Sequence, residues 1–105
     1  MSRSEHEDLH ATFLREVLEP RLKDIAAKIT QNEYHYEFFG SWFVNFEMAD
    51  RRYRLLFDGR DYRIAVETLN GNEIVAIENL RDADISIATN KLLDSFISLS
   101  RSSIV

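Results

Sequence analysis

The chain has 105 residues, of which 45% are hydrophobic and none is cysteine. A chain of this length forms one domain, and without cysteine it can hold neither a disulfide nor a thiolate metal site. Its net charge of −5 argues against a nucleic-acid ligand, because phosphate binding usually needs a basic excess, and favours a basic protein partner.

Nothing in the chain suggests insertion into a membrane or export. No apolar run approaches the roughly 20 residues that span a bilayer. Residues 1–8 are acidic and polar, whereas a signal peptide has a basic start and an apolar segment. We therefore expect a cytoplasmic protein, with a single domain over residues 1–105 and no membrane association.

The N-terminal quarter predicts a long helix with an interruption. Ser4 and Glu7 have the spacing of a capping box at the helix start. Proline lacks a backbone N–H, so the helix should kink at Pro20 or restart there, and we expect it to run from about Ser4 to Thr30. The apolar stripe of this helix comprises Leu9, Phe13, Val17, Leu22, Ile25, Ala26 and Ile29.

The next segment has the alternation of a half-buried strand. From Tyr34 to Met48 every even-numbered residue except Gly40 is aromatic or apolar, so one strand should run here, bent or broken near Gly40. A second strand is expected from Arg52 to Phe57.

Two hairpins should follow. Asp58-Gly59 supplies the positive φ of a tight turn and leads into a third strand from Tyr62 to Leu69. Asn70-Gly71 is a further hairpin signal, before a fourth strand from Glu73 to Glu78. These short connections favour an antiparallel meander.

The C-terminal segment predicts a second helix of three to four turns, starting near Asp84 or Thr89. Its apolar positions are Ile85, Ala88, Leu92, Leu93, Phe96, Ile97 and Leu99. The predicted fold is therefore α+β: an N-terminal helix, a four-stranded antiparallel meander and a C-terminal helix. Both helices should cover one face of the sheet, because it is the only surface large enough to bury them, and the other face stays open.

Two constellations could carry chemistry. The run His6-Glu7-Asp8-Leu9-His10 matches the zinc-peptidase motif, in which two histidines hold the metal and the glutamate activates water. It lies in the first turns of the opening helix, where little surrounds a metal, so we expect no metal or other cofactor. Asp58 and Asp61 are a candidate acid–base pair, but aspartate is also an ordinary turn residue, and we expect that role.

The open sheet face favours partner binding, since it mixes large apolar groups with charges. Its expected members are Glu37, Phe39, Phe43, Asn45, Glu47, Arg54, Leu56, Arg63, Ala65, Glu67 and Leu69. The residues expected to contact a partner are Glu37, Phe43, Asn45, Glu47, Arg54, Asp58, Asp61 and Glu67. Alternatively, loops cover this face or the chain dimerises through it.

The order of helix, meander and helix, with Gly40-Ser41-Trp42 before the strand and the segment Leu55-Leu56-Phe57-Asp58-Gly59-Arg60-Asp61 at the hairpin, resembles small immunity proteins. Those proteins belong to bacterial contact-dependent growth inhibition and related polymorphic toxin systems. The resemblance implies a cytoplasmic antidote, monomeric or homodimeric and not an enzyme. It would bind a cognate toxin domain, often a basic nuclease, and occlude its active site. The acidic residues that would pair with the toxin's lysines and arginines are Glu47, Asp58, Asp61, Glu67, Glu73 and Glu78.

Two other functions stay open. A secretion chaperone that binds an effector polypeptide is also a small, acidic α/β protein. A small enzyme or metal-binding domain could use His6 and His10, or a pocket between helices and sheet lined by Trp42, Tyr53 and Tyr62.

Overall fold

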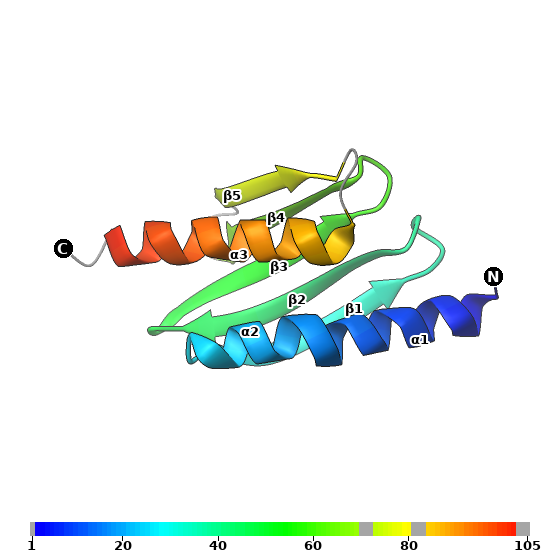
Figure 1. The fold of residues 1–105 in the computed structure, drawn as a ribbon, viewed down its shortest axis with the longest axis horizontal. Coiled ribbons are helices and arrows are strands. Elements are labelled where there is room, and N and C mark those ends of the chain that lie inside the picture. Colours follow the sequence, from blue (N-terminus) through cyan, green and yellow to red (C-terminus); the bar gives the residue numbers. More distant parts are fainter. Residues whose placement is uncertain (1, 70–72, 81–83, 103–105) are drawn as a thin grey trace.

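The computed structural model describes residues 2–69, 73–80 and 84–102, and it contains a five-stranded antiparallel sheet with helices before and after it (Figure 1). The strands are adjacent in chain order. The elements are α1 (Arg3–Phe13), the π-helical turn η1 (Leu14–Leu18), α2 (Glu19–Asp24), β1 (Lys28–His35), β2 (Ser41–Met48), β3 (Arg51–Asp58), β4 (Arg63–Thr68), β5 (Ile74–Asn79) and α3 (Ile85–Ser102). The α+β class and the meander are confirmed, with five strands instead of the four predicted.

The opening helix starts earlier than its capping box predicts. The hydroxyl of Ser2 accepts a hydrogen bond from the Glu5 N–H (3.3 Å) and so forms the N-cap, while Glu7 pairs with Arg3 at 2.8 Å. The predicted interruption at Pro20 is confirmed, because the helix passes through η1 and returns to α-helical geometry at Glu19, with proline in the first turn.

The helix also ends earlier than predicted, and the single strand expected over 34–48 is instead the end of β1, a turn and β2. Ala26 adopts a positive φ of 56°, and the chain then enters β1, which pairs with β2 through Tyr34 opposite Trp42. The turn between them contains two successive left-handed residues, Phe39 (φ 59°) and Gly40 (φ 71°). In a hairpin, directly opposite residues point to the same face of the sheet. Here the opposite residues of β1 and β2 next to the turn are also both even-numbered or both odd-numbered, so the alternation continues through the turn and does not reveal it.

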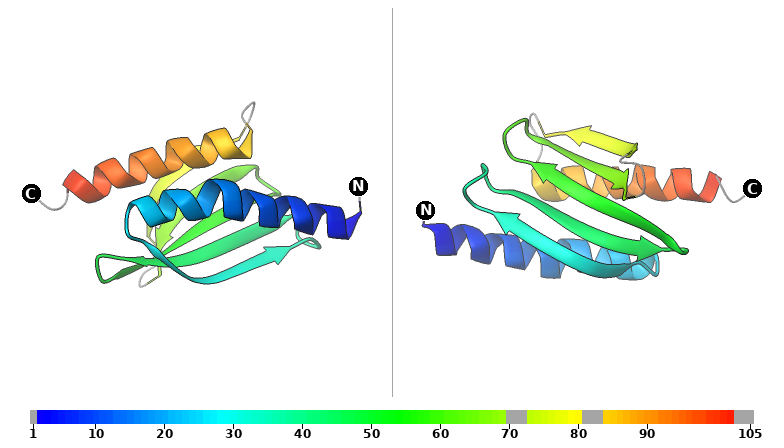
Figure 2. Two further views of the ribbon diagram at one scale, coloured as in Figure 1. Left: turned by 60° about the horizontal axis from the view of Figure 1, so that its bottom comes forward. Right: turned by 180° about the vertical axis from the view of Figure 1, so that it is seen from behind.

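Both helical segments lie on one face of the sheet, as predicted (Figure 2). Phe96 of α3 packs edge-on against Phe46 (ring centroids 5.8 Å apart) and Tyr53 (5.0 Å). Arg21 joins α2 to α3 through Asp94 at 2.6 Å. The side chains that are no more than 2% exposed include Leu18, Leu22, Trp42, Val44, Phe46, Leu55, Ile64, Val66, Ala88, Leu92, Leu93 and Phe96. These residues come from helices and strands alike and form one core.

The C-terminal helix begins where the sequence predicts but is longer. Its start at Ile85 follows Asp84, whose carboxylate accepts a hydrogen bond from the Ser86 N–H at 2.6 Å. Its 18 residues exceed the predicted three to four turns. In the part of the chain that the structure describes, no helix is both long and apolar enough to cross a membrane.

The β3–β4 turn is correctly placed, although its glycine has a different role from the one predicted. Gly59 does not adopt a positive φ, and Tyr62 (φ 53°) supplies that conformation instead. A Cβ atom at Gly59 would lie 2.0 Å from the carbonyl oxygen of Phe39, so this position needs glycine because the two hairpin turns touch. The predicted Asn70-Gly71 hairpin lies outside the described residues.

Candidate binding surface

No helix or strand that the structure describes covers the face of the sheet opposite α1 and α3, as the rear view in Figure 2 shows. Strand pairing sets its outward side chains in two parallel rows. The first row consists of Glu33, Phe43, Leu56, Ala65 and Ile77. The second row consists of Gln31, Asn45, Arg54, Glu67 and Ile74. A mostly apolar row therefore lies beside a mostly polar one, and we call these ten residues the open face.

Hydrogen bonds hold the side chains of the open face over β1, β2 and β3 in one arrangement. Asn45 is only 6% exposed, and its Oδ1 accepts a hydrogen bond from Arg54 Nε at 2.8 Å. Its Nδ2 donates to Gln31 Oε1 at 3.2 Å, and Gln31 in turn donates to Glu33. The Arg54 guanidinium carbon lies 4.1 Å from the centre of the Phe43 ring, a cation–π contact. These side chains are thus positioned before any partner arrives.

The part of the open face over β3, β4 and β5 is hollowed and lined by apolar and charged side chains. A depression of about 160 Å³ lies over β3, β4 and β5, with Leu56, Ala65, Ile74 and Ile77 among its walls. Ile74 is 62% exposed and Ile77 46% exposed. The charged residues that also line this hollow are Asp58, Arg63 and Glu67. Such a site can take an apolar side chain that carries a polar end.

Four exposed aromatic side chains lie at one end of the sheet, where the β1–β2 and β3–β4 turns meet. These four residues, here called the aromatic tip, are Tyr36, Phe38, Phe39 and Tyr62, which are 38%, 64%, 69% and 61% exposed. The two turns are joined by the contact at Gly59, whose N–H also donates to Ser41 Oγ at 2.9 Å. Sequence alternation had assigned Tyr36 and Phe38 to the buried face, and this assignment is wrong because both lie in the turn. The sequence signal for a turn in this region was Gly40, near which the strand was expected to bend or break.

The predicted contact residues fall into three groups. The residues that lie on the outward side of the strands are Phe43, Asn45, Glu47, Arg54 and Glu67, although Asn45 is buried by its neighbours. Asp58 lines the hollow, and Asp61 lies in the β3–β4 turn, 3.2 Å from Arg63. Glu37 was expected on the strand, which is wrong: it lies in the β1–β2 turn and pairs with Arg3 of α1 at 2.8 Å.

Several of these carboxylates already have partners within the chain. Asp58 accepts hydrogen bonds from the backbone N–H groups of Arg60 (3.0 Å) and Asp61 (3.2 Å), which is the turn role expected from its position. Glu47 lies 3.8 Å from Arg52. Within the described ranges no ion pair involves Glu67, so its carboxylate is the acidic group of the hollow that remains open to a basic partner.

The histidines of the zinc-peptidase motif face aromatic rings. His6 lies 5.5 Å from the Tyr36 ring and His10 stacks on Tyr34 at 4.7 Å, while Glu7 pairs with Arg3. Burial lowers the pKa of His10, and its buried Nε2 has no hydrogen-bond partner among the described residues. Nowhere in residues 2–69, 73–80 or 84–102 do three histidine or carboxylate side chains gather as a metal site requires.

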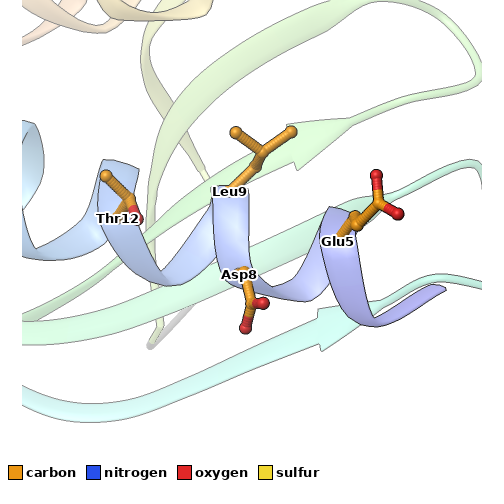
Figure 3. Close-up of a pocket in the computed structure, with 4 residues that line it drawn as sticks. All are labelled: Glu5, Asp8, Leu9 and Thr12. Atoms are coloured by element: carbon orange, nitrogen blue, oxygen red, sulfur yellow. The ribbon is translucent and has the colours of Figure 1, made fainter. Parts of the chain in front are cut away.

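Two of the hollows that described residues line lie on the helical side. One, of about 250 Å³, lies between α1, the sheet and the start of α3, and it is lined by His6, Leu9, His10, Phe13, Tyr34, Trp42 and Ile85. Of the predicted pocket residues only Trp42 reaches it, since Tyr53 is buried in the core and Tyr62 is exposed in a turn. The other hollow is lined by Glu5, Asp8, Leu9 and Thr12, all from α1, as Figure 3 shows. Because one helix supplies every wall, this second hollow cannot enclose a ligand.

Comparison of the chain with protein-family models, curated proteins and solved structures finds no significant match. The geometry of the open face is therefore what points to a function.

Proposed function

We propose that this chain is a protein-binding module that captures a partner on its open face and inhibits it by occlusion, in the manner of an immunity protein. The observation that supports the proposal is a sheet face without helices in which a preorganised polar row adjoins an apolar hollow. Side chains that are already ordered lose less entropy on binding, so such a face is suited to tight association.

The chemistry of the hollow favours a basic side chain from the partner. The alkyl stem of a lysine or arginine would lie on Leu56 and Ile77, and its charged end would reach the carboxylate of Glu67. The net charge of −5 would draw such a partner to the chain. Basic toxin domains, including nucleases, have this character.

The aromatic tip extends the surface beyond the strands. Large aromatic side chains dominate interface energetics, and each adds about 1.5–3 kcal/mol when a partner buries it fully. Phe38 and Phe39 are the most exposed members of the tip, at 64% and 69%. We expect them to form an apolar anchor beside the two rows of the open face.

The test begins with the tagged chain in its native host, where mass spectrometry of the captured proteins identifies the partner. Affinity for that partner is then measured for the double variant Phe43→Ala/Glu47→Lys, which changes the outward side of β2. We expect Kd to rise at least about tenfold, or about 1.4 kcal/mol, because an apolar contact is lost and a charge is reversed.

A matched control changes the helical side of the molecule. Leu9→Ala/Glu16→Lys also removes one apolar side chain and reverses one exposed acidic charge, and it should leave Kd unchanged. If the control weakens binding as much as the β2 variant, or if the β2 variant binds normally, the open face is not the binding surface. Inhibition of the partner's activity by the wild-type chain tests the occlusion.

A further inference from the structure

The two edges of the sheet differ in how well they are protected. The edge strand β1 carries polar and charged side chains, which discourage pairing with another chain. Both edge strands have a register irregularity, between Ile29 and Gln31 in β1 and between Ile74 and Ala76 in β5. The polar and charged residues of β1 include Lys28, Thr30, Gln31, Asn32 and Glu33. The other edge, β5, reads Ile-Val-Ala-Ile-Glu-Asn and has a single charge, Glu78. Figure 1 shows no described element beyond β5.

One hydrogen bond and the register of β5 on β4 show which backbone groups of β5 face outward. Leu80 N–H donates to Tyr62 O at 2.9 Å, in the register that also pairs Ile64 with Glu78. Hydrogen-bonded and non-hydrogen-bonded pairs alternate along an antiparallel ladder, so Glu78 directs its N–H and C=O toward β4. Ile77 and Asn79 therefore direct their backbone N–H and C=O groups away from the sheet, where a further strand could pair with them.

We propose that β5 pairs antiparallel with the β5 strand of a second copy of this chain, about a two-fold axis at Ile77. In this register Ile77 lies opposite its own equivalent, and Asn79 lies opposite Val75 of the second copy. The outward backbone groups of Ile77 then bond to each other across the axis. The register is also free of charge repulsion, because Glu78 lies opposite Ala76, whereas a register centred on Glu78 would set two carboxylates face to face.

Side-chain packing on the open face favours the same arrangement. Ile77 is 46% exposed and lies on the outward side of β5, so the two copies of this side chain would meet at the axis. The two hollows would then lie next to each other on one continuous face. That face stays uncovered in the dimer, so the dimer goes beyond the proposed function and does not depend on it.

The absence of cysteine from the chain allows a direct test by crosslinking. Opposite residues in an antiparallel pair have Cα atoms about 4.5–5.5 Å apart, which a disulfide can bridge. Ile77→Cys should form a disulfide-linked dimer in a glutathione buffer. Ile87→Cys, at a position on α3 that is 57% exposed, is the matched control and should stay largely uncrosslinked.

Light scattering on the purified chain, with no other protein present, supplies the second measurement. The wild-type mass should be twice that of one chain, and Ile77→Lys should reduce it to one, because two ammonium groups would meet at the axis. Ile87→Lys should leave the dimer intact. A monomeric wild-type chain would overturn the proposal, even if β5 accepts a strand from another protein. So would equal crosslinking of the two cysteine variants.

Discussion

The hydrogen bond between Asn45 and Arg54 gives the most specific test of the open face's geometry. Asn45→Ala removes a hydrogen bond to a charged group, worth about 1.5–3 kcal/mol, and a neutral one to Gln31, worth about 1 kcal/mol. Water can replace part of the lost hydrogen bonding at Arg54, which is partly exposed, so we expect a loss of about 2 kcal/mol in the free energy of unfolding. For a domain near this size, that is a fall of roughly 10 °C in Tm.

A double-mutant cycle isolates the interaction. Urea unfolding of the wild type, Asn45→Ala, Arg54→Ala and the double variant is followed by the fluorescence of Trp42, which is buried and the only tryptophan. Because both single variants break the same hydrogen bond, the double variant should lose about 1 kcal/mol less than the sum of the two.

The neighbouring pair on the same two strands supplies the matched control. Glu47 and Arg52 lie opposite each other at 3.8 Å, but both side chains are about half exposed or more. Exposed ion pairs contribute about 0–1 kcal/mol, so their coupling should be the smaller of the two. Additive losses for Asn45 and Arg54, within about 0.5 kcal/mol, would refute the preorganised polar row.

Three further predictions concern the fold that supports this surface. Gly59→Ala should destabilise the protein by about 1–3 kcal/mol in thermal unfolding, because the new Cβ would collide with the Phe39 carbonyl; an unchanged Tm would mean that the two turns do not touch. Phe96→Ala should cost about 3–5 kcal/mol in urea unfolding, since this side chain is fully buried, and a loss below about 1 kcal/mol would show that α3 is not docked on the sheet. The pKa of His10 is lowered by burial, so as the pH falls below about 6.5 the unfolded chain binds a proton that the folded chain does not. The free energy of unfolding should therefore fall between about pH 7 and pH 5, and His10→Phe should flatten that slope; an equal slope in both proteins would contradict the burial of His10.

Much of the fold follows from local patterns in the chain. The apolar residues of the C-terminal segment recur at helical spacing, and Ala88, Leu92, Leu93 and Phe96 are all buried in α3. The exposed Leu99 belongs to the same predicted stripe, because helical spacing cannot show where the sheet beneath the helix ends. The outward placement of Phe43 and Arg54 also follows from alternation alone.

The hairpin at residues 36–40 shows where local patterns fail. Apart from Gly40, the apolar alternation continues from the end of β1 at Tyr34 into β2, so the apolar pattern does not distinguish one long strand from two short ones. The aromatic tip was missed for the same reason, since Tyr36 and Phe38 have the parity of buried residues but lie in a turn.

The sequence by itself determined the class of fold, the order of most elements and the side of β2, β3 and β4 that faces the helices, because these depend on spacings within a few residues. Only the tertiary structure decided which distant side chains meet: Asn45 with Gln31 and Arg54, and Gly59 with Phe39. Those contacts depend on the register between strands and on the approach of two turns, and both arise only when the whole sheet packs against its helices.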